Sequence, residues 1–265
     1  MTDSRLDPIA VDVKAGVATL TLDRVGAMNA IDLPMARRFS DVVEALSERA
    51  DVRAMLVTGR GRAFCAGGDV SAMGTADDPP AYLAELAATM HGGLVRLSRM
   101  RVPVVAAVNG SVAGAGLGLA LAADLVIAGV SARFLTAYCE IGLTPDCGVS
   151  HLLPQVIGLR RALELTLTGR VLSAAEAQAW GLVTEVTADE AAHPRAESIA
   201  ATLAGGAWPA LGESRGLLRA AAATTYADHL DLEARTISRV SASADAVGRI
   251  EAFVARRAHG KESLT

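Results

Sequence analysis

Short apolar segments alternate with segments of helical periodicity through the first two thirds of the chain, and this alternation constrains the fold more than any other feature. Four segments predict strands: residues 17–22, 54–58, 103–108 and 125–128. Three segments between them predict helices: residues 32–47, 82–100 and 114–123. The later strand segments are almost continuously apolar, as strands are when helices cover both faces of a parallel sheet. The order therefore predicts an α/β fold with largely parallel pairing.

The last third of the chain is helical in character. Ser173 and Glu176 have the spacing of a capping box, which predicts a helix that ends near Trp180. From Pro194 onward the sequence is rich in helix-forming residues and contains no convincing strand. We therefore expect an α/β core over residues 1–195 and a C-terminal helical section over residues 196–265.

The charge and size of the chain limit the classes of function that it can have. Its 265 residues are long enough to bury one large core, and 51% of them are hydrophobic. The formal net charge of -4 argues against a nucleic-acid partner, because binding phosphates needs clustered Lys and Arg.

The three cysteines, Cys65, Cys139 and Cys147, lack the paired spacing of a zinc or redox site and are too few for a disulfide framework. We expect reduced thiols and no metal. The first twelve residues carry three Asp and no apolar signal segment, and the apolar stretch at 113–123 is too short to span a bilayer. These observations favour a cytoplasmic protein with no membrane contact.

Two glycine-rich loops follow predicted strands, at residues 61–69 and 109–118. Small residues let a ligand approach the backbone, and free N–H groups in such loops, or at the start of a helix, can hold an anionic oxygen. Neither loop is a phosphate loop or a dinucleotide fingerprint. The alternative is that each loop is only a turn and that Gly114 and Gly116 allow close helix packing.

Together with their spacing and flanking motifs, these loops resemble the crotonase (enoyl-CoA hydratase/isomerase) superfamily. The segments that carry the resemblance are residues 22–24, 28–30, 63–69, 103–110, 141–146, 167–170 and 179–183. The resemblance implies a crotonase-like spiral of ββα units with a C-terminal helical section for oligomerisation. It further implies a homotrimer or hexamer and a role in fatty acid metabolism. The implied substrate is an acyl-CoA, and no cofactor is expected because coenzyme A is part of that substrate.

The family holds the thioester carbonyl between two backbone N–H groups, and motif matching puts these at Ala66 and Ala115. Such an oxyanion hole needs small residues rather than particular side chains, and one donor is worth about 2.7–4 kcal/mol of transition-state stabilisation. The same matching implies substrate or coenzyme A contacts at Arg24, Met28, Phe64, Gly67, Gly68, Asp69, His91, Gly114 and Gly116.

The two glutamates of the family's hydratases are absent, since their positions hold Gly118 and Tyr138. Several isomerase branches instead place a catalytic Asp where this chain has Asp146, and Tyr138 could assist it or shape the pocket. An Asp in an apolar pocket has its pKa raised toward the range useful for moving protons. The alternatives are that Asp146 is a turn residue after Pro145, and that Glu140 is a substitute acid.

The resemblance therefore favours double-bond isomerisation of an enoyl- or dienoyl-CoA, with Asp146 as the general acid and base. Three alternatives stay open. They are an enoyl-CoA hydratase with altered acid/base residues, an aroyl-CoA hydrolase or dehalogenase that uses His91 with Asp146, and a non-catalytic member that binds acyl-CoA. For His91 the favoured interpretation is an ordinary surface or core residue of an amphipathic helix.

Overall fold

The computed structural model describes residues 7–262, with side chains through residue 256, so residues 1–6 of the acidic N-terminus lie outside the described part. Two sheets form the centre of the molecule. The larger has six strands in the order β1-β2-β3-β5-β7-β10 and is parallel except for the β1–β2 pair. The smaller has four strands in the order β4-β6-β8-β9, with only the β8–β9 pair antiparallel.

The strands of the larger sheet are β1 (Ile9–Lys14), β2 (Val17–Leu22), β3 (Ala54–Gly59), β5 (Val104–Val108), β7 (Leu125–Gly129) and β10 (Glu185–Thr187). Those of the smaller sheet are β4 (Ala63–Cys65), β6 (Ser111–Ala113), β8 (Arg133–Leu135) and β9 (Leu172–Ser173). Three times in succession the chain runs through a strand of the larger sheet, a short turn, a strand of the smaller sheet and then a helical segment. This repeat is the spiral of ββα units expected from the sequence.

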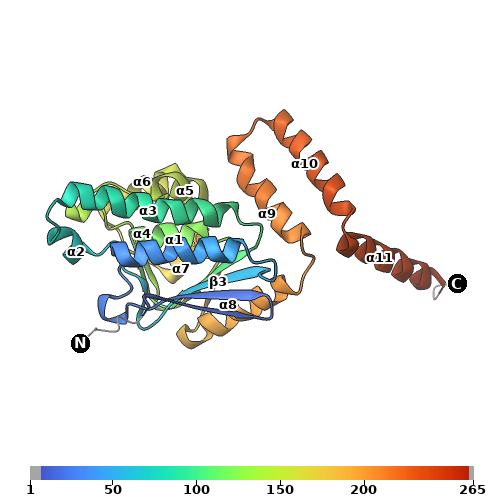
Figure 1. Cartoon of the computed structure of the whole chain (residues 1–265), viewed down its shortest axis with the longest axis horizontal. Coiled ribbons are helices and arrows are strands. Elements are labelled where there is room, and N and C mark those ends of the chain that lie inside the picture. Colours follow the sequence, from blue (N-terminus) through green and yellow to red (C-terminus); the bar gives the residue numbers. More distant parts are fainter. Residues whose placement is uncertain (1–6, 263–265) are drawn as a thin grey trace.

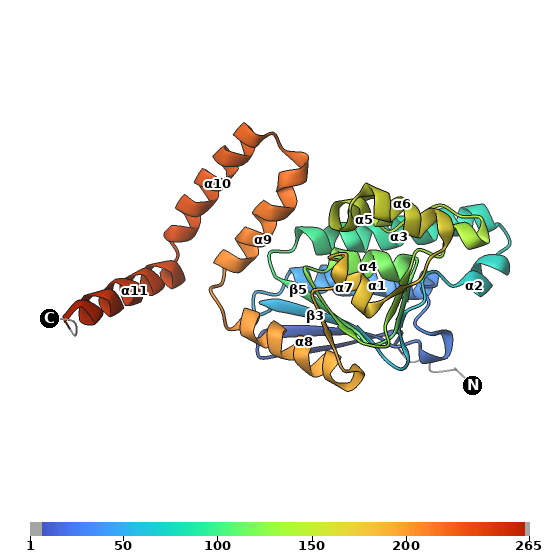
Figure 2. The same ribbon diagram turned by 180° about the vertical axis from the view of Figure 1, so that it is seen from behind.

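The helices of the body are α1 (Leu33–Ser47), α2 (Val70–Gly74), α3 (Pro79–Arg99), α4 (Ala115–Ala122), α5 (Val149–Ile157), α6 (Leu159–Thr168), α7 (Ala174–Ala179) and α8 (Asp189–Ala204). Short 3-10 turns lie at η1 (Val25–Ala27) and η2 (Cys139–Ile141). Helices α1 and α3 pack side by side on one side of the larger sheet, and α8 covers its other face (Figures 1 and 2). The main apolar core fills the space between the two sheets, α1, α3 and α4.

Most predicted elements are confirmed. Asp32 caps α1 by accepting a hydrogen bond from the Met35 N–H, and Ser173 with Glu176 forms the expected capping box at α7. The short strands of the smaller sheet were not predicted, because two or three residues carry too little periodicity, and helices α2, α5 and α6 were not predicted either. Helix α8 crosses residue 195 and buries Ala192, Ala196, Ala200 and Ala204 against the sheet. The division of the chain into two domains stays a prediction.

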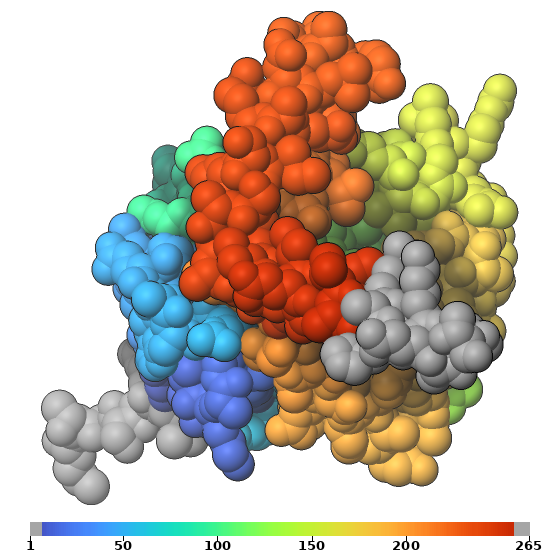
Figure 3. Space-filling view, turned by 90° about the vertical axis from the view of Figure 1, so that its right-hand side faces the viewer, coloured from blue at the N-terminus to red at the C-terminus, as the bar shows by residue number. Residues whose placement is uncertain are grey.

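Three more helices follow α8: α9 (Ala210–Ala220), α10 (Tyr226–Ser241) and α11 (Ala244–Glu262). The turn η3 (Ala221–Ala223) separates α9 from α10. Asp124 binds the guanidinium groups of Arg215 and Arg219 at 2.6 Å each, which fixes α9 to the body. Helices α10 and α11 project away from the body (Figure 1), and Figure 3 looks at the molecule from the side of this arm. Within the described residues, no helix is long and apolar enough to cross a membrane.

Candidate active site

A cavity of about 410 Å³ lies where the loops of the smaller sheet meet α2 and α3. One wall is apolar and comes from both helices: Val70, Met73, Leu83, Leu86, Ala87 and Met90. The facing wall carries the only two charged side chains of the lining, Glu140 and Asp146, beside Tyr138. The cavity therefore combines an apolar binding surface with carboxylates at one side, as small-molecule sites commonly do.

The two glycine-rich loops meet at this cavity. A Cβ on Gly67 would lie 3.0 Å from the Ala113 carbonyl oxygen, and one on Gly114 would lie 3.6 Å from the Gly67 Cα. Both glycines have positive φ angles, 97° and 50°, which side-chain-bearing residues rarely adopt. Glycine at these positions lets the two backbones touch, and this contact brings Gly68 and Ala115 to the same cavity wall.

The expectation that the Ala66 N–H is free to bind a ligand is wrong. This N–H donates a 3.1 Å hydrogen bond to the Met28 carbonyl oxygen, inside the loop. Its neighbours Gly67 and Asp69 pair with Ile31, through the Gly67 carbonyl and the Asp69 N–H. Gly68 lies between these two residues in extended backbone, so its N–H points away from Ile31. Among the described residues, no acceptor for the Gly68 N–H exists.

Ala115 is the first residue of α4, so its N–H has no partner within the helix. It also has no backbone acceptor elsewhere in the described part of the chain. The cavity wall thus carries two available backbone donors, Gly68 and Ala115, rather than Ala66 and Ala115. Both lie where the dipole at the N-terminus of α4 favours negative charge.

Asp146 is held by Tyr138 on the opposite side of the cavity. The Tyr138 hydroxyl donates a 2.6 Å hydrogen bond to Oδ1 of Asp146. Burial, followed by the nearby Asp146 carboxylate, raises the pKa of Tyr138 well above its usual range, so the hydroxyl keeps its proton and remains a donor. The Glu140 carboxylate is turned toward Gly169, where an added Cβ would lie 2.9 Å from Glu140 Oε1. Of the two carboxylates, Asp146 is therefore the one that hydrogen bonding fixes in the cavity wall.

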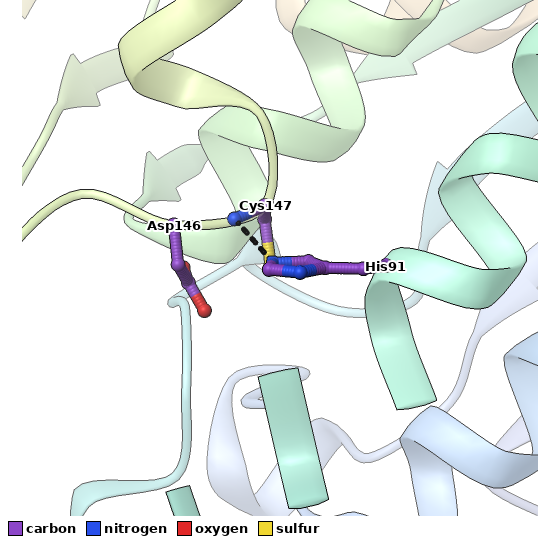
Figure 4. Close-up of side chains that lie close together, drawn as sticks. All are labelled: His91, Asp146 and Cys147. Carbon is purple, nitrogen blue, oxygen red and sulfur yellow. Dashed lines mark hydrogen bonds between the residues drawn. The ribbon is translucent and has the colours of Figure 1, made fainter. Parts of the chain in front are cut away.

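His91 reaches the same segment from α3. Its Nε2 accepts a 3.0 Å hydrogen bond from the backbone N–H of Cys147 (Figure 4). Donor atoms of His91, Asp146 and Cys147 all lie within 4.8 Å of one another, so the fold gathers a potential metal-ligand set that sequence spacing does not reveal.

This set is already engaged within the protein. His91 Nε2 and Asp146 Oδ1 each accept a hydrogen bond, and burial with the adjacent Asp146 raises the pKa of the Cys147 thiol. Burial also raises the pKa of Cys65 to about 12. All three cysteines are free, as expected. A metal ion bound through His91 Nε2, Asp146 Oδ1 and the Cys147 sulfur would displace both hydrogen bonds and the thiol proton, and the expectation of no resident metal stays a prediction.

Gly118, which occupies one of the hydratase glutamate positions, packs directly on this segment. A Cβ there would overlap the Cys147 carbonyl oxygen and lie 2.8 Å from the Cys147 Cβ. The second hydratase position is Tyr138, which is protonated and bonded to Asp146. The space that a glutamate at 118 would need is thus filled by the segment that carries Asp146.

Several expected ligand contacts have structural roles instead. Arg24 pairs with Asp32 and Asp69 at 3.0 Å each and donates to the Ala30 carbonyl oxygen, and Asp69 also caps α2. Phe64 is fully buried in β4, and a Cβ on Gly116 would lie 2.7 Å from the Cys65 Cβ. Phe64 and Gly116 therefore serve the packing of β4 and α4 and lie outside the cavity lining, and ligand contact at these residues stays a prediction. Met28 is exposed and does not line the cavity. Its backbone has a left-handed conformation, in which it caps the C-terminal end of η1.

Two groups of site residues were missed from the sequence. The buried Asn29 amide donates to the carbonyl oxygens of Arg60, Ala63 and Phe64, which ties the first loop to the segment that follows η1. The apolar wall formed by Leu83, Leu86 and Met90 follows the three- and four-residue spacing of one helix face, a signal that the sequence does carry.

A second cavity, of about 470 Å³, lies near Trp208 at the carboxyl ends of α1 and α3. Arginines line it, and three of them already pair with carboxylates: Arg49 with Asp51, Arg96 with Glu44, and Arg101 with Glu213. It contains neither glycine-rich loop. The first cavity is therefore the candidate active site.

Comparison with known proteins places this site in context. Residues 12–261 match the family model described as enoyl-CoA hydratase/isomerase. The chain is 38% identical to the 1,2-epoxyphenylacetyl-CoA isomerase of Escherichia coli, over 92% of this chain and 94% of the relative. It is 35% identical to 4-chlorobenzoyl coenzyme A dehalogenase-2 of an Arthrobacter species, over 74% and 72%. An enoyl-CoA hydratase structure from Mycobacterium smegmatis superposes with a TM-score of 0.88 at 28% identity, covering 94% of this chain and 96% of that one.

Proposed function

The chain belongs to the enoyl-CoA hydratase/isomerase family of acyl-CoA-modifying enzymes, and from that premise we propose that it isomerises a double bond in an enoyl- or dienoyl-CoA. The single observation that carries this proposal is the placement of Asp146. Its carboxylate lies in the wall of an apolar cavity, with one oxygen held at 2.6 Å by a protonated Tyr138. An isomerisation needs one group to take a proton from the substrate and return it at another carbon, and a fixed carboxylate can do both.

The thioester carbonyl would bind between the N–H groups of Gly68 and Ala115. Removing a proton beside the thioester puts negative charge on that oxygen, and preorganised backbone donors stabilise such charge most in a site without water. The acyl group would then lie along Val70, Met73, Leu86 and Met90, with Asp146 across the cavity. The two loops and Asp146 thus act on the same part of the substrate.

Hydration is a weaker candidate for this site. Neither position of the family's two glutamates holds a carboxylate, since Gly118 has no side chain and Tyr138 is a phenol that donates a hydrogen bond to Asp146. Water addition would require Asp146 to perform both proton transfers and to position the water.

Hydrolysis of an aroyl-CoA is the second candidate, favoured by the short separation of His91 and Asp146. In that reaction Asp146 would attack the halogen-bearing aromatic carbon and displace halide, and water activated by His91 would then hydrolyse the aryl ester and restore the Asp146 carboxylate. We rank it second because His91 Nε2 already accepts the Cys147 N–H and is not free to take a proton from water.

The proposal includes an assembly and a setting. Leu218, Tyr226 and Ile237 are each more than 70% exposed on α9 and α10, which supports burial of the projecting arm in a trimer or hexamer. We further propose that the enzyme acts in the cytoplasm on acyl-CoA of fatty acid metabolism, with no cofactor beyond the coenzyme A of the substrate.

A panel of acyl-CoA thioesters tests the reaction class directly. The products of linear enoyl-CoA, dienoyl-CoA, phenylacetyl-type epoxide and halogenated aroyl-CoA substrates are analysed by mass spectrometry and ultraviolet absorbance. Isomerisation leaves the mass unchanged and shifts the absorbance. A product heavier by one water, or release of halide, would contradict the proposal and select hydration or hydrolysis respectively.

A further inference from the structure

The segment that carries Asp146 adopts a backbone conformation that needs support from outside. Cys147 and Gly148 follow Asp146 with φ angles of 48° and 79°, two successive residues in the left-handed region. For Cys147 this is an unfavourable conformation, because its Cβ crowds the backbone. The direction of the Asp146 side chain depends on these neighbours, since a rotation at Cys147 would swing the preceding carboxylate.

Three contacts from three different elements restrain the segment. Tyr138 holds the Asp146 carboxylate, and the Val149 N–H at the start of α5 donates a 2.9 Å hydrogen bond to the Asp146 carbonyl oxygen. The third contact comes from α3, where His91 Nε2 accepts the Cys147 N–H at 3.0 Å. This hydrogen bond links Cys147, the residue in the unfavourable conformation, to helix α3.

The direction of this hydrogen bond fixes the state of the imidazole. A backbone N–H can only donate, so Nε2 must carry a lone pair and the ring proton lies on Nδ1. Within the described residues His91 does not line the cavity, and Figure 4 shows its ring directed at the backbone nitrogen of Cys147 while the Asp146 carboxylate points elsewhere. The ring is therefore placed to hold the segment and not to exchange protons with a bound substrate.

We infer that His91 is a positioning residue, whose neutral Nε2 holds the Cys147 N–H and thereby aims the Asp146 carboxylate into the cavity. This inference rests on the proposed function only in that Asp146 is the proton carrier. It assigns His91 a role distinct from that of a base in hydrolysis and from that of an ordinary exposed histidine.

The test compares two replacements of His91 that differ in one property. His91→Gln keeps a hydrogen-bond acceptor near the position of Nε2 but cannot act as a base, whereas His91→Leu fills a similar space with no acceptor. We expect His91→Leu to lower kcat for isomerisation about 10- to 100-fold with KM little changed, and His91→Gln to restore most of that loss. His193→Leu, on α8 across the sheet, is the matched control and should keep normal activity.

Amide exchange gives a second readout that does not depend on turnover. Labelling the three cysteines with ¹⁵N leaves three backbone amide signals, those of Cys65, Cys139 and Cys147. The Cys147 amide should be protected from hydrogen exchange in the unaltered protein and in His91→Gln, and should exchange much faster in His91→Leu. The Cys65 amide reports whether the fold is intact in each variant.

The outcomes separate failure of this inference from failure of the proposed function. If both His91 variants are equally inactive, His91 takes part in the chemistry and the positioning role is wrong. If His91→Leu keeps full activity and Cys147 protection, the contact does not hold the segment and the inference is equally wrong. If Asp146→Asn, measured in parallel, keeps normal turnover, the proposed function fails, whereas the exchange result still decides whether His91 holds Cys147.

Discussion

The Tyr138 hydroxyl and Oδ1 of Asp146 are joined by a 2.6 Å hydrogen bond across the turn η2, in the wall of the largely apolar cavity between α3 and the smaller sheet. The two hydratase glutamate positions hold Gly118 and Tyr138, so Asp146 is the carboxylate that hydrogen bonding fixes in this wall. The bond leaves one carboxylate fixed by a donor that stays protonated, facing two backbone N–H groups on the other wall.

The first prediction concerns the Ala115 N–H. Ala115→Pro removes this donor at the first position of α4, where proline is compatible with the helix and no intrahelical bond is lost. Loss of one oxyanion donor should lower kcat about 100- to 1000-fold, because a donor of this kind contributes about 2.7–4 kcal/mol to the transition state. Steady-state kinetics with the best substrate of the panel measures the effect. Ala115→Gly keeps the N–H and should remain active; equal losses in both variants would rule out the N–H as the cause.

The second prediction concerns the missing hydratase carboxylate. Gly118→Glu should abolish isomerisation without creating hydration, because any Cβ at this position overlaps the Cys147 backbone and displaces Asp146. Overpacking of this kind costs about 1–3 kcal/mol, so the melting temperature should fall as well. Gly118→Ala is the control, since it adds the Cβ alone and should lose activity for the same reason. Rapid water addition to an enoyl-CoA by Gly118→Glu would contradict the prediction, because it would show that the segment at Cys147 moves to make room for the glutamate.

The third prediction concerns alkaline pH. Burial and the Asp146 carboxylate raise the pKa of Tyr138, so the unfolded chain releases this proton first as the pH rises through about 10. The stabilisation that the neutral hydroxyl contributes is therefore present below about pH 10 and is lost above it. Urea unfolding at a series of pH values should show a steeper alkaline loss of stability for the unaltered protein than for Tyr138→Phe. Parallel curves for the two proteins would mean that Tyr138 ionises normally in the fold.

The fourth prediction concerns metals. Activity should survive exhaustive chelation, because His91 Nε2 and Asp146 Oδ1 already accept hydrogen bonds from within the protein, which disfavours binding of a metal ion through these atoms. The measurement is turnover before and after dialysis against a chelator, with metal content determined in the same samples. Loss of turnover that a divalent ion restores would identify the cluster of His91, Asp146 and Cys147 as a working metal site.

Much of the larger sheet could be predicted from the sequence because its strands and helices are long enough to show their periods. Four of its strands and the helices α1, α3 and α4 fall within a few residues of their expected positions. The smaller sheet could not be predicted, since β4, β6 and β8 are three residues each and are recognisable only as continuations of the repeating unit. Helix α8 was misplaced for a different reason: it begins at Asp189, and Pro194 lies inside it and not at the start of the helical section.

The site was predicted in part for a similar reason. The two loops found by motif matching meet at the cavity, and Asp146 and Ala115 line it. It failed at Ala66 because the sequence does not reveal which N–H groups a loop uses internally, and here Met28 takes that one. It also left His91 ambiguous, since the contact with Cys147 joins residues 56 positions apart and depends on the tertiary fold.

The most direct test of the central claim is the rate of enoyl-CoA isomerisation by Asp146→Asn, measured beside Glu140→Gln. Asparagine keeps the shape and the hydrogen bonding of Asp146 but cannot accept the substrate proton, so turnover should fall by at least about 100-fold while acyl-CoA binding stays nearly intact. Glu140→Gln should cost much less, because the Glu140 carboxylate is turned toward Gly169. Near-normal turnover by Asp146→Asn together with loss of activity in Glu140→Gln would contradict the account and move the proton transfer to Glu140.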